Sequence, residues 1–242
     1  MSKNILIIGA TSDIAMATGR IFAKNGYSLT LAGRSIQRLE PFKKDTEVLY
    51  DLQVNLINFD VTALDHHDKL LEAISPNCEA VIYAAGYLGK EGDHSDGEIE
   101  SIINANYSGA VLILEKIASK WYEESGKTII GISSVAGDRG RMSNYLYGSA
   151  KAGFSAYLSG LRNRLYHSGT HVMTVKPGFV ATKMTQHLDL PKPLTASPEK
   201  VAKVIYRGFR KKKNTIYVLG IWKWILLIIK LIPEGIFKRL KL

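Results

Sequence analysis

Residues 4–15 read NILIIGATSDIA, and this stretch decides the fold. The run 4–8 is continuously apolar and rich in Ile, which is typical of a strand buried on both faces. Gly9 ends the run, and a helical pattern then continues to Lys24. A second strand is predicted at residues 29–32. A strand, a Gly-containing turn, a helix and a strand in this order form a unit that binds a dinucleotide pyrophosphate at the helix N-terminus.

Two charged residues bear on which dinucleotide this unit would hold. Asp13 stands in the turn where a further glycine would be usual, and it can cap the helix N-terminus. Its charge opposes phosphate binding unless the side chain points back to backbone N–H groups. Arg34 follows the second strand, where an acid would bind the ribose 2′-hydroxyl of NAD. An arginine suits a 2′-phosphate, so NADP(H) is favoured over NAD(H). The alternative is that Arg34 is a solvated loop cation.

Strands and helices alternate through the rest of the chain. Further apolar runs predict strands at residues 54–59, 80–83, 127–132, 172–175 and 215–218. Helical periodicity predicts helices at residues 35–49, 64–74, 99–121, 145–165 and 198–212, the last with Ser197 as its cap. This order predicts a single α/β domain with a doubly wound, seven-stranded parallel sheet. Ligands bind at the carboxyl ends of the strands in such sheets.

Length and composition fit one domain with a full apolar core. The lone cysteine, Cys78, excludes an internal disulfide framework and fits a reducing compartment. The N-terminal apolar run is too short for a signal peptide. The net charge of +10 is concentrated after residue 206, where ten Lys and Arg residues accompany a single acidic residue. This basic end indicates an anionic partner there, either a membrane surface or nucleic acid.

Residues 134–151, SVAGDRGRMSNYLYGSAK, carry the predicted chemistry. Tyr147 and Lys151 are four residues apart, so on a helix they share one face. A nearby ammonium lowers the pKa of a phenol, and the pair would make a proton donor that works near neutral pH. Ser134 can offer its hydroxyl to a carbonyl oxygen that gains negative charge. A ketone held between Ser134 and Tyr147 would need only a hydride source.

Three other segments are expected around this site. Ala84, Ala85 and Gly86 follow the fourth strand, and such small residues would let a flat ring approach the backbone. Asn106 lies within a long predicted helix, where it disfavours regular geometry and marks a kink or a bound water. Residues 183–197 are polar and lack periodicity, and we interpret them as a substrate lid.

The order and spacing of these motifs resemble the short-chain dehydrogenase/reductase family over residues 3–210. The motifs are Gly9-Ala10-Thr11-Ser12, Ala84-Ala85-Gly86, Asn106, Ser134, Tyr147-x-x-x-Lys151 and Pro177-Gly178-x-x-x-Thr182. The resemblance implies a Rossmann-type fold and an NAD(P)(H) cofactor. It implies that Tyr147 is the catalytic acid/base and that Ser134 orients the substrate oxygen. It further implies that Lys151 binds the nicotinamide ribose and lowers the pKa of Tyr147, and that Asn106 holds a water.

The resemblance also implies the cofactor contacts. Thr182 would contact the nicotinamide carboxamide, and Asp60 with Val61 would contact the adenine. The full set expected at the cofactor is Gly9, Thr11, Ser12, Asp13, Ile14, Arg34, Asp60, Val61, Ala84, Ala85, Gly86, Tyr147, Lys151, Pro177, Gly178, Val180 and Thr182. No metal site is expected. Asp13 and Ala15 depart from the glycines usual in the family.

Residues 219–242 are interpreted as a basic tail that follows a catalytic domain of residues 1–218. The polar residues after residue 221 follow one narrow helical stripe, and apolar residues, with Trp222 and Trp224 among them, cover the rest. The apolar run is shorter than the ~20 residues needed to span a bilayer, and Pro233 interrupts it. We therefore expect an amphipathic helix in the membrane interface. The alternative is a subunit interface, because the family commonly forms dimers or tetramers, and a homo-oligomer is expected. A nucleic-acid partner is not expected, because the aromatics flank an apolar run rather than a basic groove.

A narrower resemblance concerns the substrate. The turn GATSDIA and the tail are similar to those of the keto-reductases that act with decaprenylphosphoryl-ribose 2′-epimerase. Those enzymes reduce a 2-keto-pentofuranose on a polyprenyl phosphate for cell-envelope polysaccharide. The resemblance implies a lipid-linked sugar substrate, a partner oxidase, and a cytoplasmic enzyme held peripherally at the inner face of the cell membrane. The alternatives are a reductase of another lipid or small ketone whose tail serves oligomerisation, and a non-catalytic dinucleotide-binding scaffold. A complete set of Ser134, Tyr147 and Lys151 argues against the scaffold.

Overall fold

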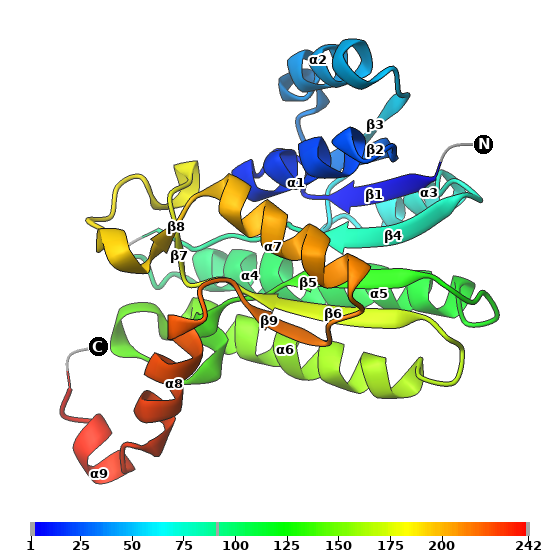
Figure 1. Cartoon of the computed structure of the whole chain (residues 1–242). Helices are drawn as coiled ribbons and strands as arrows, with labels where there is room; N and C mark the ends of the chain where they lie inside the picture. The colour runs from blue at the N-terminus through cyan, green and yellow to red at the C-terminus, as the bar shows by residue number, and fades with distance from the viewer. Residues whose placement is uncertain (1–2, 91, 241–242) are drawn as a thin grey trace.

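The central sheet has seven parallel strands in the order β3-β2-β1-β4-β5-β6-β9 (Figure 1). The computed structural model describes residues 3–90 and 92–240. The strands are β1 (Asn4–Ile8), β2 (Ser28–Gly33), β3 (Val54–Asn58), β4 (Cys78–Tyr83), β5 (Thr128–Ile132), β6 (His171–Lys176) and β9 (Thr215–Tyr217). Ile5 of β1 pairs with Leu29 on one side and with Ala80 on the other. The predicted doubly wound parallel sheet is confirmed, and its strand order reverses between β1 and β4.

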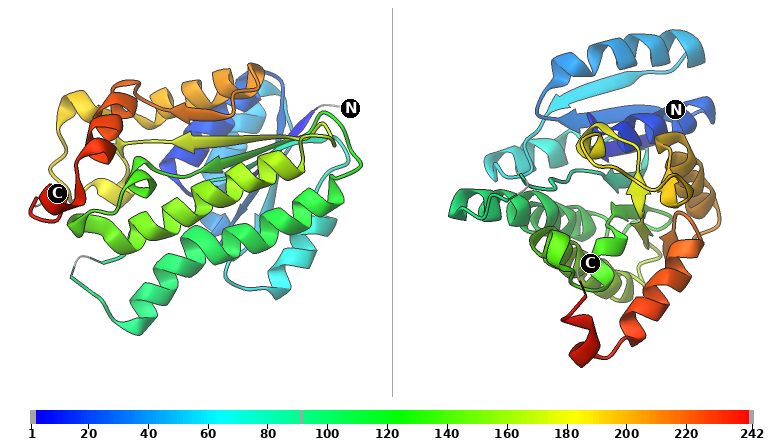
Figure 2. Two further views of the ribbon diagram at one scale, coloured as in Figure 1. Left: turned by 90° about the horizontal axis from the view of Figure 1, so that it is seen from below. Right: turned by 90° about the vertical axis from the view of Figure 1, so that its left-hand side faces the viewer.

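Helices cover both faces of this sheet (Figures 1 and 2). One face is covered by α1 (Asp13–Lys24), α2 (Glu40–Tyr50) and α7 (Pro198–Arg210), and the other by α3 (Asp65–Glu72), α5 (Gly109–Lys120) and α6 (Tyr145–Arg164). Phe22 and Ile205 belong to the first buried cluster, and Ile113 and Phe154 to the second. Because both faces are buried, the strands are continuously apolar rather than alternating.

Three helices differ from their predicted bounds. The helix expected at residues 35–49 begins only at Glu40, after a short 3-10 turn (Ile36–Arg38), and ends where Asp51 adopts a left-handed conformation. The helix expected at residues 99–121 is divided into α4 (Asp96–Ile103), a π-helical turn (Asn104–Ser108) and α5. The helix expected at residues 64–74 is shorter, at Asp65–Glu72. The predicted cap of α7 is confirmed, because the Ser197 hydroxyl accepts the Lys200 N–H at 3.2 Å.

The lid and the tail lie at the carboxyl edge of the sheet (Figure 2). The lid segment is joined at its base by β7 (Phe179–Val180) and β8 (Thr195–Ala196), a two-stranded parallel ladder that the sequence did not reveal. The tail forms α8 (Ile221–Leu231) and a short α9 (Glu234–Phe237). The chain turns at Ile232 and Pro233, where α8 ends, and this agrees with the interruption of the apolar run that the sequence shows at Pro233.

Candidate active site

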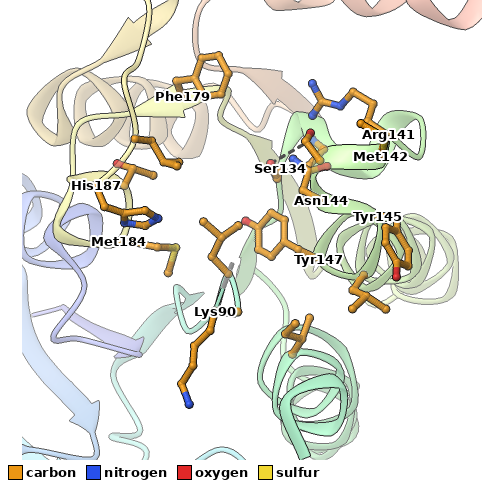
Figure 3. A pocket seen from close by; sticks show the side chains of 18 of the residues that line it. Lys90, Ser134, Arg141, Met142, Asn144, Tyr145, Tyr147, Phe179, Met184 and His187 are labelled. Atoms are coloured by element: carbon orange, nitrogen blue, oxygen red, sulfur yellow. Dashed lines mark hydrogen bonds between the residues drawn. The ribbon is translucent and has the colours of Figure 1, made fainter. Parts of the chain in front are cut away.

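Ser134 and Tyr147 line the same cavity near the carboxyl end of β5 (Figure 3), and the Lys151 Nζ donates to the carbonyl oxygen of Ile132, the last residue of that strand. Ser134 directly follows the strand, while Tyr147 and Lys151 project from α6. The Ser134 hydroxyl accepts the Ala136 N–H at 3.1 Å and lies close enough to the Tyr147 phenol to lower the pKa of that group. The neighbouring Ser133 donates its hydroxyl to the Lys151 carbonyl oxygen at 3.0 Å. This last bond ties α6 to β5 and thereby fixes the separation of the catalytic groups.

Glycines allow the loop after Ser134 to lie directly on α6. A Cβ at Gly137 would stand 2.6 Å from the Ala152 nitrogen, and one at Gly148 would stand 2.9 Å from the Ala136 carbonyl oxygen. Both distances are shorter than real Cβ contacts. These two glycines therefore allow close backbone packing between the loop and α6.

Burial controls the ionisation of the catalytic pair. It raises the pKa of Tyr147 to about 12, against the opposing effect of the Ser134 hydrogen bond. It lowers the pKa of Lys151 to about 7, and the Lys151 Nζ donates to the Ile132 carbonyl oxygen at 3.2 Å. The Lys151 Nζ lies 5.6 Å from the centroid of the Tyr147 ring. Contrary to expectation, Lys151 does not depress the Tyr147 pKa here, because desolvation dominates both groups.

Asn106 occupies the π-helical turn between α4 and α5 and is fully buried. Its Nδ2 donates to the carbonyl oxygens of Tyr87 at 2.6 Å and Ile102 at 2.8 Å, and its Oδ1 accepts the Tyr87 N–H at 3.2 Å. A Cβ at Gly86 would stand 2.9 Å from Asn106 Oδ1 and 3.3 Å from Lys151 Nζ. The predicted kink is confirmed, and Asn106 holds the segment after β4 against the catalytic lysine.

A cavity of 570 Å³ opens beside the turn that follows β1. Predicted cofactor residues that line it are Gly9, Thr11, Ser12, Arg34, Asp60, Val61, Ala84, Ala85 and Gly86. Gly9 has a φ of +80°, and a Cβ there would stand 2.4 Å from the Ala85 nitrogen. Only glycine fits this position, where the backbone after β1 touches the backbone after β4.

Arg34 and Asp60 stand together at this cavity. The Asp60 Oδ1 accepts the backbone N–H of Thr62 at 3.0 Å and its hydroxyl at 2.8 Å. Burial opposes ionisation of Asp60, but the Thr62 hydrogen bonds and the Arg34 charge outweigh it and lower the pKa of Asp60. Arg34 itself is exposed at the rim, so its guanidinium is available to an anionic group.

Asp13 is not the helix cap that the sequence indicated. Ser12 occupies the N-cap position of α1 and makes no side-chain cap bond, while Asp13 is the first residue of the helix. The Asp13 carboxylate accepts the backbone N–H of Lys183 at 2.7 Å, and the Lys183 Nζ lies 4.0 Å away. Asp13 therefore links the first turn of α1 to the start of the lid, with its charge directed at a backbone N–H.

A second cavity of 470 Å³ lies in front of Tyr147 (Figure 3). Ser134, Arg141, Asn144 and Tyr147 form one wall in the figure, and Met184 with His187 of the lid lies opposite. This cavity and the one beside Gly9 share Lys90 and Met184 in their linings. Tyr147 lines the second cavity, and the adjoining cavity beside Gly9 gives the site a second space of a size for a small-molecule ligand.

Several predicted cofactor residues lie outside the lining of the two cavities. They are Asp13, Ile14, Lys151, Pro177, Val180 and Thr182, whereas Tyr147 and Gly178 line only the second cavity. Thr182 instead caps the short turn Lys183–Thr185, and Val180 is buried. Sequence reasoning missed Arg141, Asn144, Met184 and His187. For Arg141 and Asn144 the only available signal was their position between Ser134 and Tyr147.

The tail packs its inner face on the substrate side of the site. Trp222 and Leu226 of α8 are buried with Val135, the residue after Ser134. The Trp222 ring lies edge-on to Phe179 at 5.3 Å, and its Nε1 donates to the Leu194 carbonyl oxygen at 3.2 Å. The paired tryptophans therefore have separate environments: Trp222 belongs to the protein interior, whereas Trp224 is exposed.

Two charged residues of the catalytic loop bind the end of α8. The Arg139 guanidinium donates to the carbonyl oxygens of Ile229 and Ile232, the latter at 2.8 Å, and to Glu234 at 3.0 Å. These bonds satisfy carbonyl groups that the helix end leaves without partners. The buried Asp138 carboxylate contacts Lys230 at 3.3 Å. The tail is thus fixed to the loop that carries Ser134.

The outer face of α8 is apolar and exposed. Trp224, Ile228 and Leu231 are 63%, 66% and 73% exposed, and they follow helical spacing. Lys223 and Lys230 on the same helix are exposed as well. Across residues 3–90 and 92–240, no helix has both the length and the apolar character to cross a membrane.

The chain is similar to a known protein family and to an individual relative over most of its length. The family model described as short chain dehydrogenase matches residues 3–192. An uncharacterized oxidoreductase of Streptomyces coelicolor is 29% identical over 243 residues, covering 98% of this chain and 96% of the relative. The alignment therefore extends through the tail.

Solved structures share the fold. A short-chain dehydrogenase from Sphingobium yanoikuyae in complex with NADPH superposes with a TM-score of 0.83 at 21% identity, covering 98% of this chain and 96% of that one. A 3-oxoacyl-[acyl-carrier protein] reductase from Brucella melitensis in complex with NAD gives a TM-score of 0.80 at 20% identity, covering 91% and 96%.

Proposed function

The chain belongs to the short-chain dehydrogenase family, and from this premise we propose that it is an NADP(H)-dependent reductase of a ketone on a polyprenyl-phosphate-linked sugar. The proposal has three parts: the cofactor, the reaction and the lipid-borne substrate. Each is supported by a different region of the site.

The cavity beside Gly9 fits a dinucleotide. The N-terminus of α1 borders this cavity. Glycine and alanine residues there leave the backbone accessible, as the binding of a pyrophosphate requires. Asp60 and Val61 would contact the adenine, and Gly86 and Lys151 would lie at the nicotinamide ribose. The exposed Arg34 would pair with a 2′-phosphate, which favours NADP(H). Arg34→Asp is expected to lower the NADPH-to-NADH ratio of kcat/KM, and an unchanged ratio would make Arg34 a bystander.

The protonation state of Tyr147 suits the proton donation that a ketone reduction requires. A nicotinamide dinucleotide supplies the hydride when bound. With its pKa raised to about 12, the Tyr147 phenol is protonated at neutral pH and can donate to a ketone oxygen. The Ser134 hydroxyl orients that oxygen. The Lys151 Nζ, with its pKa lowered to about 7, can exchange the next proton near neutral pH.

The observation that carries the substrate proposal is the exposed apolar face of α8 next to the substrate cavity. Phe179 lines that cavity and also contacts Trp222, so the helix is one side chain away from the substrate. An exposed apolar face with flanking lysines suits an anionic membrane surface, where each cation contributes about 1 kcal/mol. A ketone carried by a membrane lipid would enter the site from this side.

This geometry supports a cytoplasmic enzyme bound peripherally to the inner face of the membrane. A partner oxidase would supply the ketone there. The proposal also includes self-association of the protein. In that alternative, the exposed face of α8 would form a subunit interface instead of contacting the membrane.

The deciding experiment incubates the protein and NADPH with a synthetic 2-keto-pentofuranosyl polyprenyl phosphate and follows the loss of NADPH absorbance. Parallel reactions contain a 3-ketoacyl thioester or a small cyclic ketone. We expect turnover of the lipid-linked sugar that Tyr147→Phe abolishes. Faster turnover of the acyl or small ketone would replace the substrate proposal. Unchanged turnover by Tyr147→Phe would refute the mechanism.

A further inference from the structure

The substrate cavity contains a partly buried cation, Arg141, that has no counterion among the residues that the structure describes. Arg141 precedes the short turn Met142–Asn144 and lines the cavity together with Ser134 and Tyr147. Its Nε is buried and has no hydrogen-bond partner. Among the described residues, no carboxylate forms an ion pair with Arg141. Arg139, two residues earlier, is by contrast fully engaged by Glu234 and the carbonyl groups at the end of α8.

A buried cation without a counterion raises the free energy of the folded protein unless a ligand supplies the negative charge. Burial lowers the pKa of the Arg141 guanidinium, but arginine remains charged at neutral pH. A desolvated charge without a partner destabilises the folded state, so its retention in a cavity indicates a ligand that supplies the negative charge. Besides Tyr145 and Tyr147, the other charged or titratable residues that line this cavity are Lys90, Asp93, His94, His187 and Asp189. Of these, Lys90, His94, His187 and Asp189 are exposed to water, and Asp93 accepts the Ser95 N–H at 3.0 Å.

A second buried polar atom without a hydrogen-bond partner restricts the chemical class of ligand that would fit this cavity. The Asn144 Oδ1 is buried without a hydrogen-bond partner and lies on the same wall as Arg141 (Figure 3). A carboxamide oxygen accepts hydrogen bonds, so its complement is a hydroxyl or an N–H group. The wall therefore offers a cation and an acceptor close to the catalytic pair, which matches an anionic group next to a hydroxyl.

We propose that Arg141 and Asn144 form a substrate subsite for a phosphate ester, in which Arg141 binds the phosphate and Asn144 a neighbouring hydroxyl. The planar guanidinium can bind two phosphate oxygens at once, which a lysine cannot. The inference rests on the proposed function in one respect: the ketone reduced at Tyr147 is on the same molecule as the phosphate. Arg141 would thus determine specificity for phosphorylated over neutral ketones.

A binding experiment tests the subsite without turnover. Farnesyl phosphate, farnesol and inorganic phosphate are titrated calorimetrically into the protein saturated with NADPH, so that Arg34 and the cavity beside Gly9 are occupied. Wild type is expected to bind farnesyl phosphate more tightly than either control. Arg141→Gln should weaken this binding by roughly 10- to 100-fold, the range expected for hydrogen bonds to a charged group. Arg141→Lys should recover part of the loss. Lys192→Gln, which removes an exposed lid cation that does not line the cavity, should bind as wild type does.

Each result has a defined meaning. Equal binding of farnesyl phosphate by wild type and Arg141→Gln would overturn the subsite, as would equal binding of farnesol and farnesyl phosphate by wild type. Inorganic phosphate that binds as tightly as farnesyl phosphate would overturn the assignment to an ester. Unchanged circular dichroism of Arg141→Gln excludes misfolding as the cause of a loss. Because no turnover is measured, failure of the keto-sugar assay with intact Arg141-dependent binding would refute the proposed reduction and leave the subsite standing.

Discussion

On the cofactor side of the site, the backbone after β1 touches the backbone after β4, and small residues make the contact. On the substrate side, the catalytic loop is held by side chains from the far end of the chain: Trp222 and the partners of Arg139. The first kind of contact requires particular residue types within short motifs. The second requires only that distant side chains meet. The two sides are therefore expected to respond differently to substitution and to be readable from sequence to different degrees.

The largest expected effect tests backbone contact on the cofactor side. Gly9→Ala introduces a Cβ 2.4 Å from the Ala85 nitrogen and strains a φ of +80°. Gly26→Ala is the matched control, because Gly26 has a φ of +83° and open space around its Cβ position. We expect urea unfolding to give a loss of about 1 kcal/mol for Gly26→Ala and more than about 4 kcal/mol for Gly9→Ala. Equal losses of unfolding free energy would show that the positive φ alone destabilises both variants. The backbone contact at Gly9 would then not distinguish the cofactor side from the substrate side.

The substrate side is tested by the two tryptophans of α8. Trp222→Ala should destabilise the fold by about 3–5 kcal/mol, because it opens a cavity between Val135 and Phe179. Trp224→Ala removes the same ring from the exposed face and should cost less than about 0.5 kcal/mol. Chemical denaturation measures both. If both variants unfold like wild type, the tail does not support the catalytic loop.

Lys151 lies where the two sides join, and its burial predicts a pH dependence. Its pKa is about 7 when folded and near 10.5 when unfolded, so between these values the unfolded chain holds more protons at this residue. The contribution of Lys151 to the free energy of unfolding therefore rises with pH between the folded and the unfolded pKa value. Relative to Lys151→Met, wild type should gain about 2 kcal/mol in unfolding free energy between about pH 7 and about pH 9, measured without cofactor. A difference independent of pH would place the lysine in water.

The smallest expected effect concerns the outer face of the tail. Deleting the tail would also remove Trp222 from the interior, so substitution of Trp224 and Ile228 by Gln is the cleaner test. The double variant should lower partitioning onto phosphatidylglycerol-containing vesicles by about tenfold, through lost apolar burial. The control is the exposed pair Val48 and Leu49 on α2, also changed to Gln. Unchanged partitioning with a loss of self-association in light scattering would assign this face to a subunit interface.

Much of the cofactor side could be predicted from the sequence. Short, mainly apolar segments predicted all seven strands of the sheet, and the signal is clearest at residues 4–8, where burial on both faces leaves a continuous apolar run. Gly9, Ala84–Gly86 and the spacing of Ser134 and Tyr147 were recognisable because backbone approach and helix periodicity restrict residue type locally. The kink at Asn106 was predicted for the same reason.

Most contacts on the substrate side could not be predicted from the sequence. No local pattern shows that Asp13 bonds a residue 170 positions away, or that β7 pairs with β8. Periodicity showed that α8 is amphipathic, but not that Trp222 faces the protein and Trp224 the solvent. The raised pKa of Tyr147 was missed because desolvation depends on the packed surroundings, whereas the sequence shows only the nearby Lys151.

The contact between α8 and the catalytic loop also orders events during synthesis. Ser134 and its loop leave the ribosome well before the residues that hold them, since Trp222 and Glu234 lie far downstream in the chain. The dinucleotide-binding strands and helices can therefore assemble while translation continues, but the substrate wall is completed only after residues 222–234 have emerged. A truncated or stalled nascent chain should accordingly acquire cofactor binding before it acquires reductase activity.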